Sequence, residues 1–552
     1  MKPIVEIAKE AGINPSSLIP YGTDKAKVPL DVLNIQTSRR GRLVLVSALT
    51  PTPAGEGKTV TSIGLAQGIR RLGKKVALAL RQPSMGPVFG RKGGATGGGA
   101  STVQPATDIN LHFTGDFHAI TAAHNLLAAV LDNQLHFKQT RLAPDKVLWR
   151  RALDVNDRAL RELRLSTGTG DERTGGFDIT AASEIMAIIC LANSEEDLRA
   201  RLNRLVVGFA PDGSPVTAGE FRITGSLMAL LRDALLPNLV QSAEGVPTFI
   251  HGGPFANIAH GCNSVLATRM ALAHADYAVT EAGFAFDLGG EKFIDIKCRQ
   301  SGLAPDAIVI VATVRALKMH GGANLEDAAN SSAQGVDAVL KGLPNLIQHV
   351  EAALSFERPV IVAINRFAND TEAELAVLRD ACAAMSKSGD ARQRRVFYAE
   401  SQAFEKGGSG AEQLAETVLQ CLGEPTPLQF TYPEDVSAKE KIEAIAKRFY
   451  GAAGVAFTPE SERKLALFEE AGFARLPVCV AKTQNSLSDD PTAFGRPTGF
   501  TITVRDVELA AGAGFLIALT GKMTRMPALP RIPAAEKINL RPDGVITGIS
   551  GT

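Results

Sequence analysis

The sequence predicts an α/β protein with a doubly wound, mostly parallel sheet and additional smaller α/β domains. Two observations support this. Short apolar runs suited to buried parallel strands alternate with helical patterns, and a glycine, proline or polar turn follows each run. The predicted strands lie at residues 43–46, 75–80, 246–250, 277–280, 307–313 and 359–364.

The third observation is a glycine-rich loop between the first strand and a helix at residues 60–72. A glycine-lined turn that opens a helix directs backbone N–H groups and the helix dipole at one point, where an anion binds. Lys58 adds a charge there, and the Thr59 hydroxyl suits a Mg²⁺ ion carried by a nucleotide. The segment therefore predicts a P-loop NTPase-like sheet and a nucleotide site made of Thr52, Pro53, Ala54, Gly55, Glu56, Gly57, Lys58 and Thr59. Thr52 stands where the usual motif has its first glycine, so only the second half is standard.

Length and composition exclude several classes of protein. A chain of 552 residues is too long to fold around a single hydrophobic core, and roughly three domains are expected. Lys+Arg 59 against Asp+Glu 58 gives a net charge of +1, which argues against nucleic-acid and anionic-membrane partners. No apolar stretch approaches the roughly 20 residues that span a bilayer, and residues 1–6 lack a signal-peptide pattern. We expect a cytoplasmic protein whose six scattered cysteines are reduced.

Three regions are expected along the chain. Residues 1–124 and 237–365 together form the nucleotide-binding domain. Residues 125–236 are mostly helical in pattern and form a lateral lobe. Residues 366–552 form a C-terminal α/β region, with predicted strands at 477–480, 500–504 and 515–519.

A second glycine cluster follows the second predicted strand. Glycine this dense costs conformational entropy and is retained where backbone approaches a ligand. With Arg81 near it, the cluster predicts a second anion-binding loop, and the alternative is a flexible surface loop. Its predicted phosphate-binding members are Gly93, Gly94, Gly97, Gly98 and Gly99.

Other polar residues lie near the predicted strand ends, where ligands of parallel sheets bind. Glu281 follows one strand, and Phe367 follows another. His112, His118 and His124 lie near Asp116, but no thiolate or carboxylate pair completes a metal site. We expect structural histidines, and Asp116 as an indirect partner of the Mg²⁺ ion.

Six segments in one order resemble the formate–tetrahydrofolate ligase family over nearly the whole chain. They are residues 50–59, 86–99, 110–116, 250–263, 311–322 and 481–484. Residues 311–322 match the second signature of that family without a change. The resemblance implies that formate attacks the γ-phosphate of MgATP to give formyl phosphate, and that N10 of tetrahydrofolate then takes the formyl group.

The resemblance also implies roles for particular residues. Lys58 would hold the transferring phosphoryl group, Arg81 would steady formyl phosphate, and the Phe367 and Phe404 rings would contact the pterin. Phosphoryl transfer depends mainly on positioning and charge neutralisation, which suits these side chains. A homotetramer and activation by a monovalent cation such as K⁺ or NH₄⁺ are implied as well.

This chain departs from the family pattern at several positions near the predicted site. Phe404 replaces a tryptophan, which predicts weaker folate binding with stacking intact, and Gln82 replaces an acidic residue. Further departures are Arg91, Thr96, Ala100, Ala368 and Asn485. Two alternatives stay open at this point: another P-loop ATP-dependent carboxylate ligase or kinase, and a nucleotide-switched partition-type ATPase.

Overall fold

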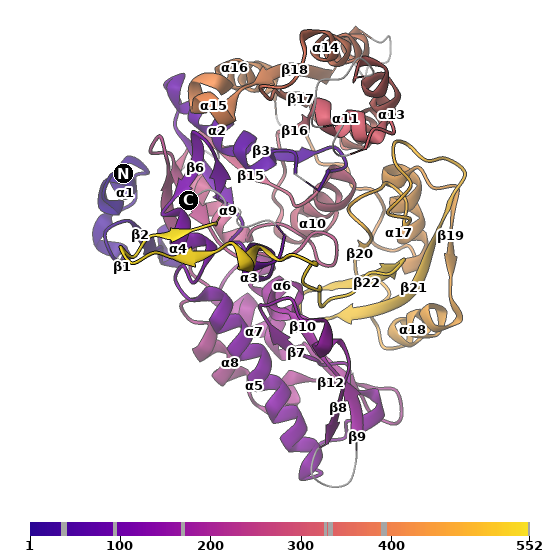
Figure 1. The fold of residues 1–552 in the computed structure, drawn as a ribbon. Helices are drawn as coiled ribbons and strands as arrows, with labels where there is room; N and C mark the ends of the chain where they lie inside the picture. Colours follow the sequence, from indigo (N-terminus) through magenta and orange to yellow (C-terminus); the bar gives the residue numbers. More distant parts are fainter. Residues whose placement is uncertain are drawn as a thin grey trace.

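The main sheet of the computed structural model contains twelve strands in the residues that the structure describes (Figure 1). Those residues are 1–34, 41–53, 55–91, 96–166, 172–324, 328, 335–387, 395–424 and 426–549. Seven adjacent strands are parallel, in the order β14 (Pro247–Ile250), β4 (Val76–Leu80), β15 (Tyr277–Glu281), β3 (Arg42–Ala48), β16 (Ala307–Ala312), β17 (Val360–Asn365) and β18 (Val396–Ser401). All six strands predicted for this sheet are confirmed.

One edge of the sheet is antiparallel. β13 (Asn238–Ser242) pairs with β14, with β2 (Lys25–Lys27) and with β6 (Ser101–Gln104). β1 (Ile19–Tyr21) and β5 (Gly97–Gly98) complete this edge. The sheet is thus large and mostly parallel.

Helices cover both faces of the sheet because alternate residues of each buried strand point to opposite sides. Leu43 and Leu45 of β3 pack with α9 (Val265–His274) in one core. Val44 and Val46 pack in another core with α2 (Lys58–Arg71), the helix predicted at residues 60–72. The continuous apolar strands are therefore explained by burial on both faces.

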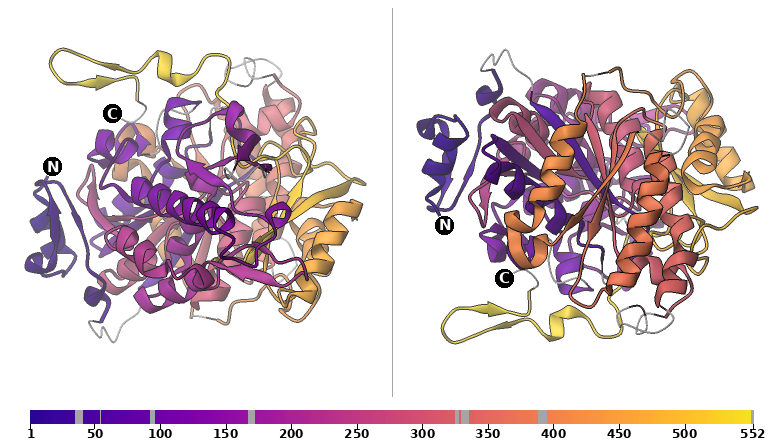
Figure 2. Two further views of the ribbon diagram at one scale, coloured as in Figure 1. Left: turned by 90° about the horizontal axis from the view of Figure 1, so that it is seen from below. Right: turned by 90° about the horizontal axis from the view of Figure 1, so that it is seen from above.

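Two smaller assemblies flank the sheet (Figure 1). Residues 125–236 contain most of α5 (Asp116–His136), together with α6 (Glu184–Leu191), α7 (Glu195–Asn203), α8 (Thr224–Leu231) and three pairs of short strands. Near the C-terminus, a four-stranded sheet runs in the order β19 (Gly454–Phe457), β21 (Thr501–Ala510), β22 (Phe515–Thr520) and β20 (Val478–Ala481). Its three predicted strands are confirmed. The hairpin of β23 (Asn539–Leu540) and β24 (Ile546–Thr547) extends away from the body (Figure 2).

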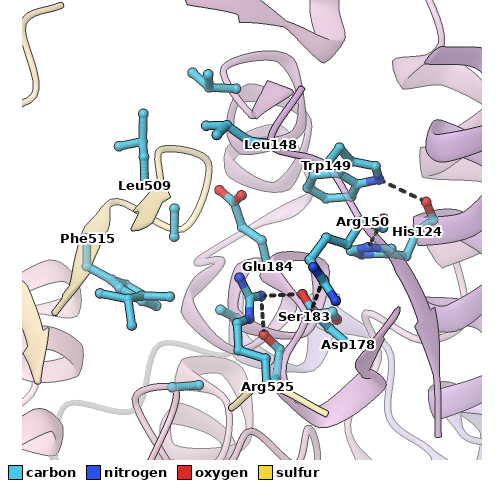
Figure 3. A pocket seen from close by; sticks show the side chains of 16 residues that line it. His124, Leu148, Trp149, Arg150, Asp178, Ser183, Glu184, Leu509, Phe515 and Arg525 are labelled. Carbon is cyan, nitrogen blue, oxygen red and sulfur yellow. Dashed lines mark hydrogen bonds and ion pairs between the residues drawn. The ribbon is translucent and has the colours of Figure 1, made fainter. Parts of the chain in front are cut away.

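A buried ionic cluster joins the lateral lobe to the C-terminal sheet (Figure 3). Asp178 lies between two arginines, 2.9 Å from Arg150 Nε and 3.1 Å from Arg525 Nη2. Arg525 also pairs with Glu508 at 2.6 Å. Arg150, Asp178 and Arg525 line a cavity of about 40 Å³, enough for a few water molecules. The cluster fixes the two assemblies to each other.

Lys27 and Asp116 form a second buried pair, under the antiparallel edge of the sheet. The Lys27 side chain is fully buried, and burial lowers the pKa of its ammonium group. Asn238 Nδ2 donates to Asp116 Oδ2 at 2.7 Å, and Lys27 Nζ donates to the Leu236 carbonyl at 2.9 Å. Asp116, which we expected near the Mg²⁺ ion, is thus engaged in an ion pair that links β2 to α5.

Asp116→Ala should lower the free energy of unfolding by about 3–5 kcal/mol, because it leaves the Lys27 ammonium buried without its partner charge. The double variant Lys27→Met/Asp116→Asn should recover much of this loss, since it removes both charges and keeps an acceptor for Asn238. Denaturant unfolding followed by circular dichroism measures both. A single variant within about 1 kcal/mol of the wild type would contradict the assignment of this pair.

Candidate functional site

The predicted nucleotide loop occupies residues 49–57, between the carboxyl end of β3 and the first residue of α2. Gly57 precedes α2 and has φ +70°, and Gly55 has φ +79°. This backbone region strongly favours glycine. A β-carbon on Gly57 would also lie 2.4 Å from Asn365 Nδ2. Both glycines are therefore required by the turn that exposes the amino end of α2.

Two polar side chains of the site, Thr59 and Arg81, converge at Glu281, the last residue of β15. Thr59 Oγ1 donates to Glu281 Oε2 at 2.8 Å, and Arg81 Nη2 lies 3.5 Å from Glu281 Oε1. Arg81 Nη1 also donates to the Pro254 carbonyl at 3.3 Å. Lys58 Nζ donates to the Phe284 carbonyl at 2.8 Å. One buried carboxylate thus joins two predicted site residues, Thr59 and Arg81.

The loop is held by its own buried acid, Glu56. Thr52 N donates to Glu56 Oε1 at 2.7 Å, and Thr313 Oγ1 donates to Glu56 Oε2. Asn365 Nδ2 donates to the Glu56 carbonyl at 3.1 Å. Thr313 follows β16 and caps α11 (Val314–His320), whereas Asn365 ends β17. Three neighbouring strands therefore contribute to one loop conformation.

A buried polar network anchors the start of the loop at Thr50. His320 Nε2 lies 2.9 Å from the Thr50 carbonyl, and Gly495 N donates to His320 Nδ1 at 3.2 Å. His320 is therefore neutral with its proton on Nε2, and burial lowers its pKa. From α13 (Gly335–Leu354), His349 Nε2 lies 3.0 Å from Thr50 Oγ1, and burial lowers the pKa of His349 to about 4.

The second glycine cluster lies against Phe404, a residue of α15 (Ala403–Lys406). Ala100 N donates to the Phe404 carbonyl at 2.8 Å. A β-carbon on Gly98 would lie 3.0 Å from the Phe404 ring, and one on Gly99 would lie 2.0 Å from the Phe404 carbonyl oxygen. The Phe404 side chain nevertheless stays 47% exposed, so the ring presents a face to solvent. The structure thus places Gly97, Gly98 and Gly99 beside a predicted folate-binding residue.

Phe367 lies just beyond the carboxyl end of β17, whose partner β18 leads to Phe404. Its amide donates to Asp370 Oδ2 at 2.8 Å. The Arg315 guanidinium lies 5.0 Å from the centre of the Phe367 ring. The two predicted folate residues therefore follow neighbouring parallel strands, close to the nucleotide loop.

The remaining predicted residues lie either outside the described residues or apart from these contacts. Ala54, Gly93 and Gly94 lie outside the described residues, and Pro53 is exposed. His112 and His118 are exposed, whereas His124 stacks on Trp149 and burial lowers its pKa to about 3. Among the described residues, no group of three or more histidine, cysteine and acidic side chains is placed to hold a metal ion. All six cysteines are free, as expected.

The chain was compared with known proteins. The family profile described as "Formate--tetrahydrofolate ligase" matches residues 1–550. A curated formate–tetrahydrofolate ligase from Hyphomonas neptunium (strain ATCC 15444) is 52% identical over 556 aligned positions, covering 100% of this chain and 98% of the relative. The chain belongs to the formate–tetrahydrofolate ligase family. A match along the whole chain does not favour a partition-type ATPase or an unrelated carboxylate kinase.

The structure also shows how the departures from the formate–tetrahydrofolate ligase pattern are accommodated. Gln82 is buried; its backbone N–H donates to the Gly252 carbonyl at 2.8 Å, and its side-chain Oε1 has no hydrogen-bond partner among the described residues. The adjacent Arg81 has Glu281 as its acidic partner. Thr96 is also buried and accepts a hydrogen bond from Asn110 Nδ2 at 3.1 Å. The Thr96 substitution therefore fits the packing around the site, whereas nothing in the structure explains Gln82.

Four contributors to the site were not among the predicted site residues. Glu281 and Asn365 had a detectable signal, because each is a polar residue at the carboxyl end of a predicted strand. Thr313 and Arg315 lie in the second signature segment, but spacing alone did not connect them to residues 50–59. The remote contacts made by parallel strand ends are set by sheet order, which the sequence does not reveal.

The loop geometry predicts different costs for two glycine substitutions. Gly73→Ala, after α2, has φ +75° with open space around the new β-carbon, so it should cost only the left-handed strain of about 1–2 kcal/mol. Gly57→Ala should cost more, because Asn365 must also move. Denaturant unfolding of both variants measures the difference. An equal decrease in the free energy of unfolding in both variants would mean that the Gly57–Asn365 contact does not constrain the loop.

Proposed function

We propose that the protein joins formate to tetrahydrofolate at the expense of ATP. In the first step a formate oxygen attacks the γ-phosphorus, the bond to the ADP oxygen breaks, and formyl phosphate and ADP form. In the second step N10 of tetrahydrofolate attacks the formyl carbon and phosphate leaves, giving 10-formyltetrahydrofolate. The full-length match to formate–tetrahydrofolate ligases carries this proposal.

The geometry around the nucleotide loop and the end of β15 supports roles for two side chains. Lys58, at the amino end of α2, would neutralise charge on the transferring phosphoryl group. Arg81 would hold formyl phosphate, because its planar fork suits carboxylate and phosphate oxygens. Its contact with Glu281 keeps this fork near Thr59.

A Mg²⁺ ion fits the pair formed by Thr59 and Glu281. Mg²⁺ prefers oxygen ligands and is usually bound through one or two carboxylates plus substrate phosphates. The Thr59 hydroxyl and the Glu281 carboxylate supply such oxygens 2.8 Å apart, at the opening of the loop. When bound, the ion would be held by Thr59 and Glu281 and would neutralise charge on the nucleotide phosphates.

We propose that the folate site is formed by residues 366–552, against the Phe367 and Phe404 rings. The exposed face of Phe404 and its position beside Gly98 support stacking with a flat pterin. The glycine cluster 93–99 would bring backbone N–H groups close to formyl phosphate.

Further features are proposed on narrower grounds. The family resemblance supports a homotetramer and activation by K⁺ or NH₄⁺. The strand–loop–helix geometry of residues 42–71 supports a P-loop NTPase-like nucleotide domain. Six free cysteines favour a reducing, cytoplasmic location. Among the described residues, no helix combines the length and apolar character needed to cross a membrane.

The function is tested by measuring ADP release and 10-formyltetrahydrofolate together, omitting ATP, formate and tetrahydrofolate in turn. We expect formation of the formylated product to require all three. Lys58→Met should lower kcat by about 100-fold or more, the scale seen when a donor to developing charge is removed. Lys74→Met, an exposed lysine just after α2, is the matched control and should leave kcat unchanged. ADP release without formylated product would refute the proposal.

Substitutions of Phe404 should change the affinity for tetrahydrofolate more than kcat. Phe404→Trp enlarges the stacking surface and should lower KM, whereas Phe404→Ala removes about 0.5–1.5 kcal/mol of ring interaction and should raise KM by about threefold to tenfold. Steady-state kinetics at saturating ATP and formate measures both. An unchanged KM in Phe404→Ala would remove this ring from the folate site.

A further inference from the structure

Arg315 contacts both predicted substrate regions. It lies in the first turn of α11, and its Nη2 donates to the Gly55 carbonyl of the nucleotide loop at 2.5 Å. The same guanidinium lies over the Phe367 ring, 5.0 Å from its centre. A single rigid group therefore touches the loop proposed to hold ATP and the ring proposed to hold the pterin.

Both contacts are local and directional. Gly55 lies in a tight turn with φ +79°, in which its amide donates to the Thr52 carbonyl at 3.0 Å. A change in that turn would displace the Gly55 carbonyl and, with it, the guanidinium. Phe367 is partly buried, so Arg315 covers part of the ring and leaves part accessible.

Only a guanidinium can make this combination of contacts. Its N–H groups donate in the plane of the group while its face lies on an aromatic ring. Lysine carries the same charge as a single ammonium point and cannot do both in this geometry. Arg315 Nε is also buried and has no hydrogen-bond acceptor among the described residues.

We propose that Arg315 is a positioning residue that couples the two substrate sites. Nucleotide bound to residues 50–59 fixes the Gly55 carbonyl, the carbonyl holds the guanidinium, and the guanidinium sets the Phe367 ring for the pterin. This inference rests on the proposed function, which places ATP on the loop and folate on Phe367. Because coupling between two binding sites is reciprocal, folate also tightens nucleotide binding by the same factor.

The test measures the Kd of tetrahydrofolate with and without a non-hydrolysable ATP analogue and Mg²⁺. In the wild type we expect the analogue to tighten folate binding about fivefold or more, the lower range of measured site-to-site coupling. In Arg315→Ala and Arg315→Lys the ratio of the two Kd values should fall to about one. A general loss of stability would raise the Kd of tetrahydrofolate both with and without the analogue and would leave the ratio of the two Kd values unchanged.

Arg366→Ala is the matched control. It removes a guanidinium beside Phe367 that pairs with Glu400 at 3.5 Å, and it should keep the wild-type ratio. If Arg315→Ala does not fold, Arg315→Lys retains the charge, and the same ratio of Kd values is measured on that variant. A wild-type ratio in either Arg315 variant, or no coupling in the wild type, would overturn the inference.

Phe367→Leu separates this inference from the proposed function. If Phe367→Leu weakens folate binding while Arg315→Ala keeps the coupling ratio, the folate site is correctly placed and only the coupling fails. If Phe367→Leu leaves the Kd of folate unchanged, the proposed placement of folate fails, and the coupling through this ring fails with it.

Discussion

The buried carboxylate of Glu56 is the constraint on which the site depends. Its two oxygens accept hydrogen bonds from the Thr52 amide and the Thr313 hydroxyl. The backbone carbonyl of Glu56 accepts a third hydrogen bond, from the Asn365 side chain. A carboxylate buried this deeply is stable only when its oxygens are hydrogen-bonded. The loop conformation and the order of β3, β16 and β17 are therefore linked, and the amino end of α2 is arranged before any substrate binds.

Parallel topology explains how residues far apart in sequence reach one place. The carboxyl ends of β4, β15, β16, β17 and β18 lie at one edge of the sheet, and a residue of the site ends each strand or follows it closely. In strand order these residues are Arg81, Glu281, Thr313, Asn365 and Phe404. Preorganised charge of this kind suits phosphoryl transfer, in which the protein supplies position and neutralisation.

Much of the fold was predictable because its central strands are buried on both faces and read as continuous apolar runs. β18 was not predicted, since it lies at the edge of the sheet and half of its side chains are partly exposed. Residues 164–176 are typical of a surface loop by composition, but the structure contains there the pair β8 (Leu163–Ser166) and β9 (Glu172–Gly175). Short, polar strands leave little periodic signal.

The candidate site was predictable in part, for a related physical reason. Lys58 and Thr59 belong to a local motif whose chemistry depends on adjacent residues, so the sequence identifies them. Glu281 had a signal as a polar residue at a predicted strand end, but its contact with Thr59 depends on strand order. The contact of Arg315 with the loop likewise depends on strand order and could only be recognised in three dimensions. Asp116 shows the opposite case. Its sequence context suggested an indirect partner of the Mg²⁺ ion, but in the structure it is buried in an ion pair with Lys27.

The most direct test of the central claim, that this site activates formate by phosphoryl transfer, follows an oxygen atom. A single turnover with ¹⁸O-labelled formate, MgATP and tetrahydrofolate is quenched, and the released phosphate is analysed by mass spectrometry. A formate oxygen that attacks the γ-phosphorus stays on that phosphorus when N10 displaces phosphate from the formyl carbon. We therefore predict one ¹⁸O in each phosphate released; unlabelled phosphate alongside newly formed 10-formyltetrahydrofolate would contradict the claim.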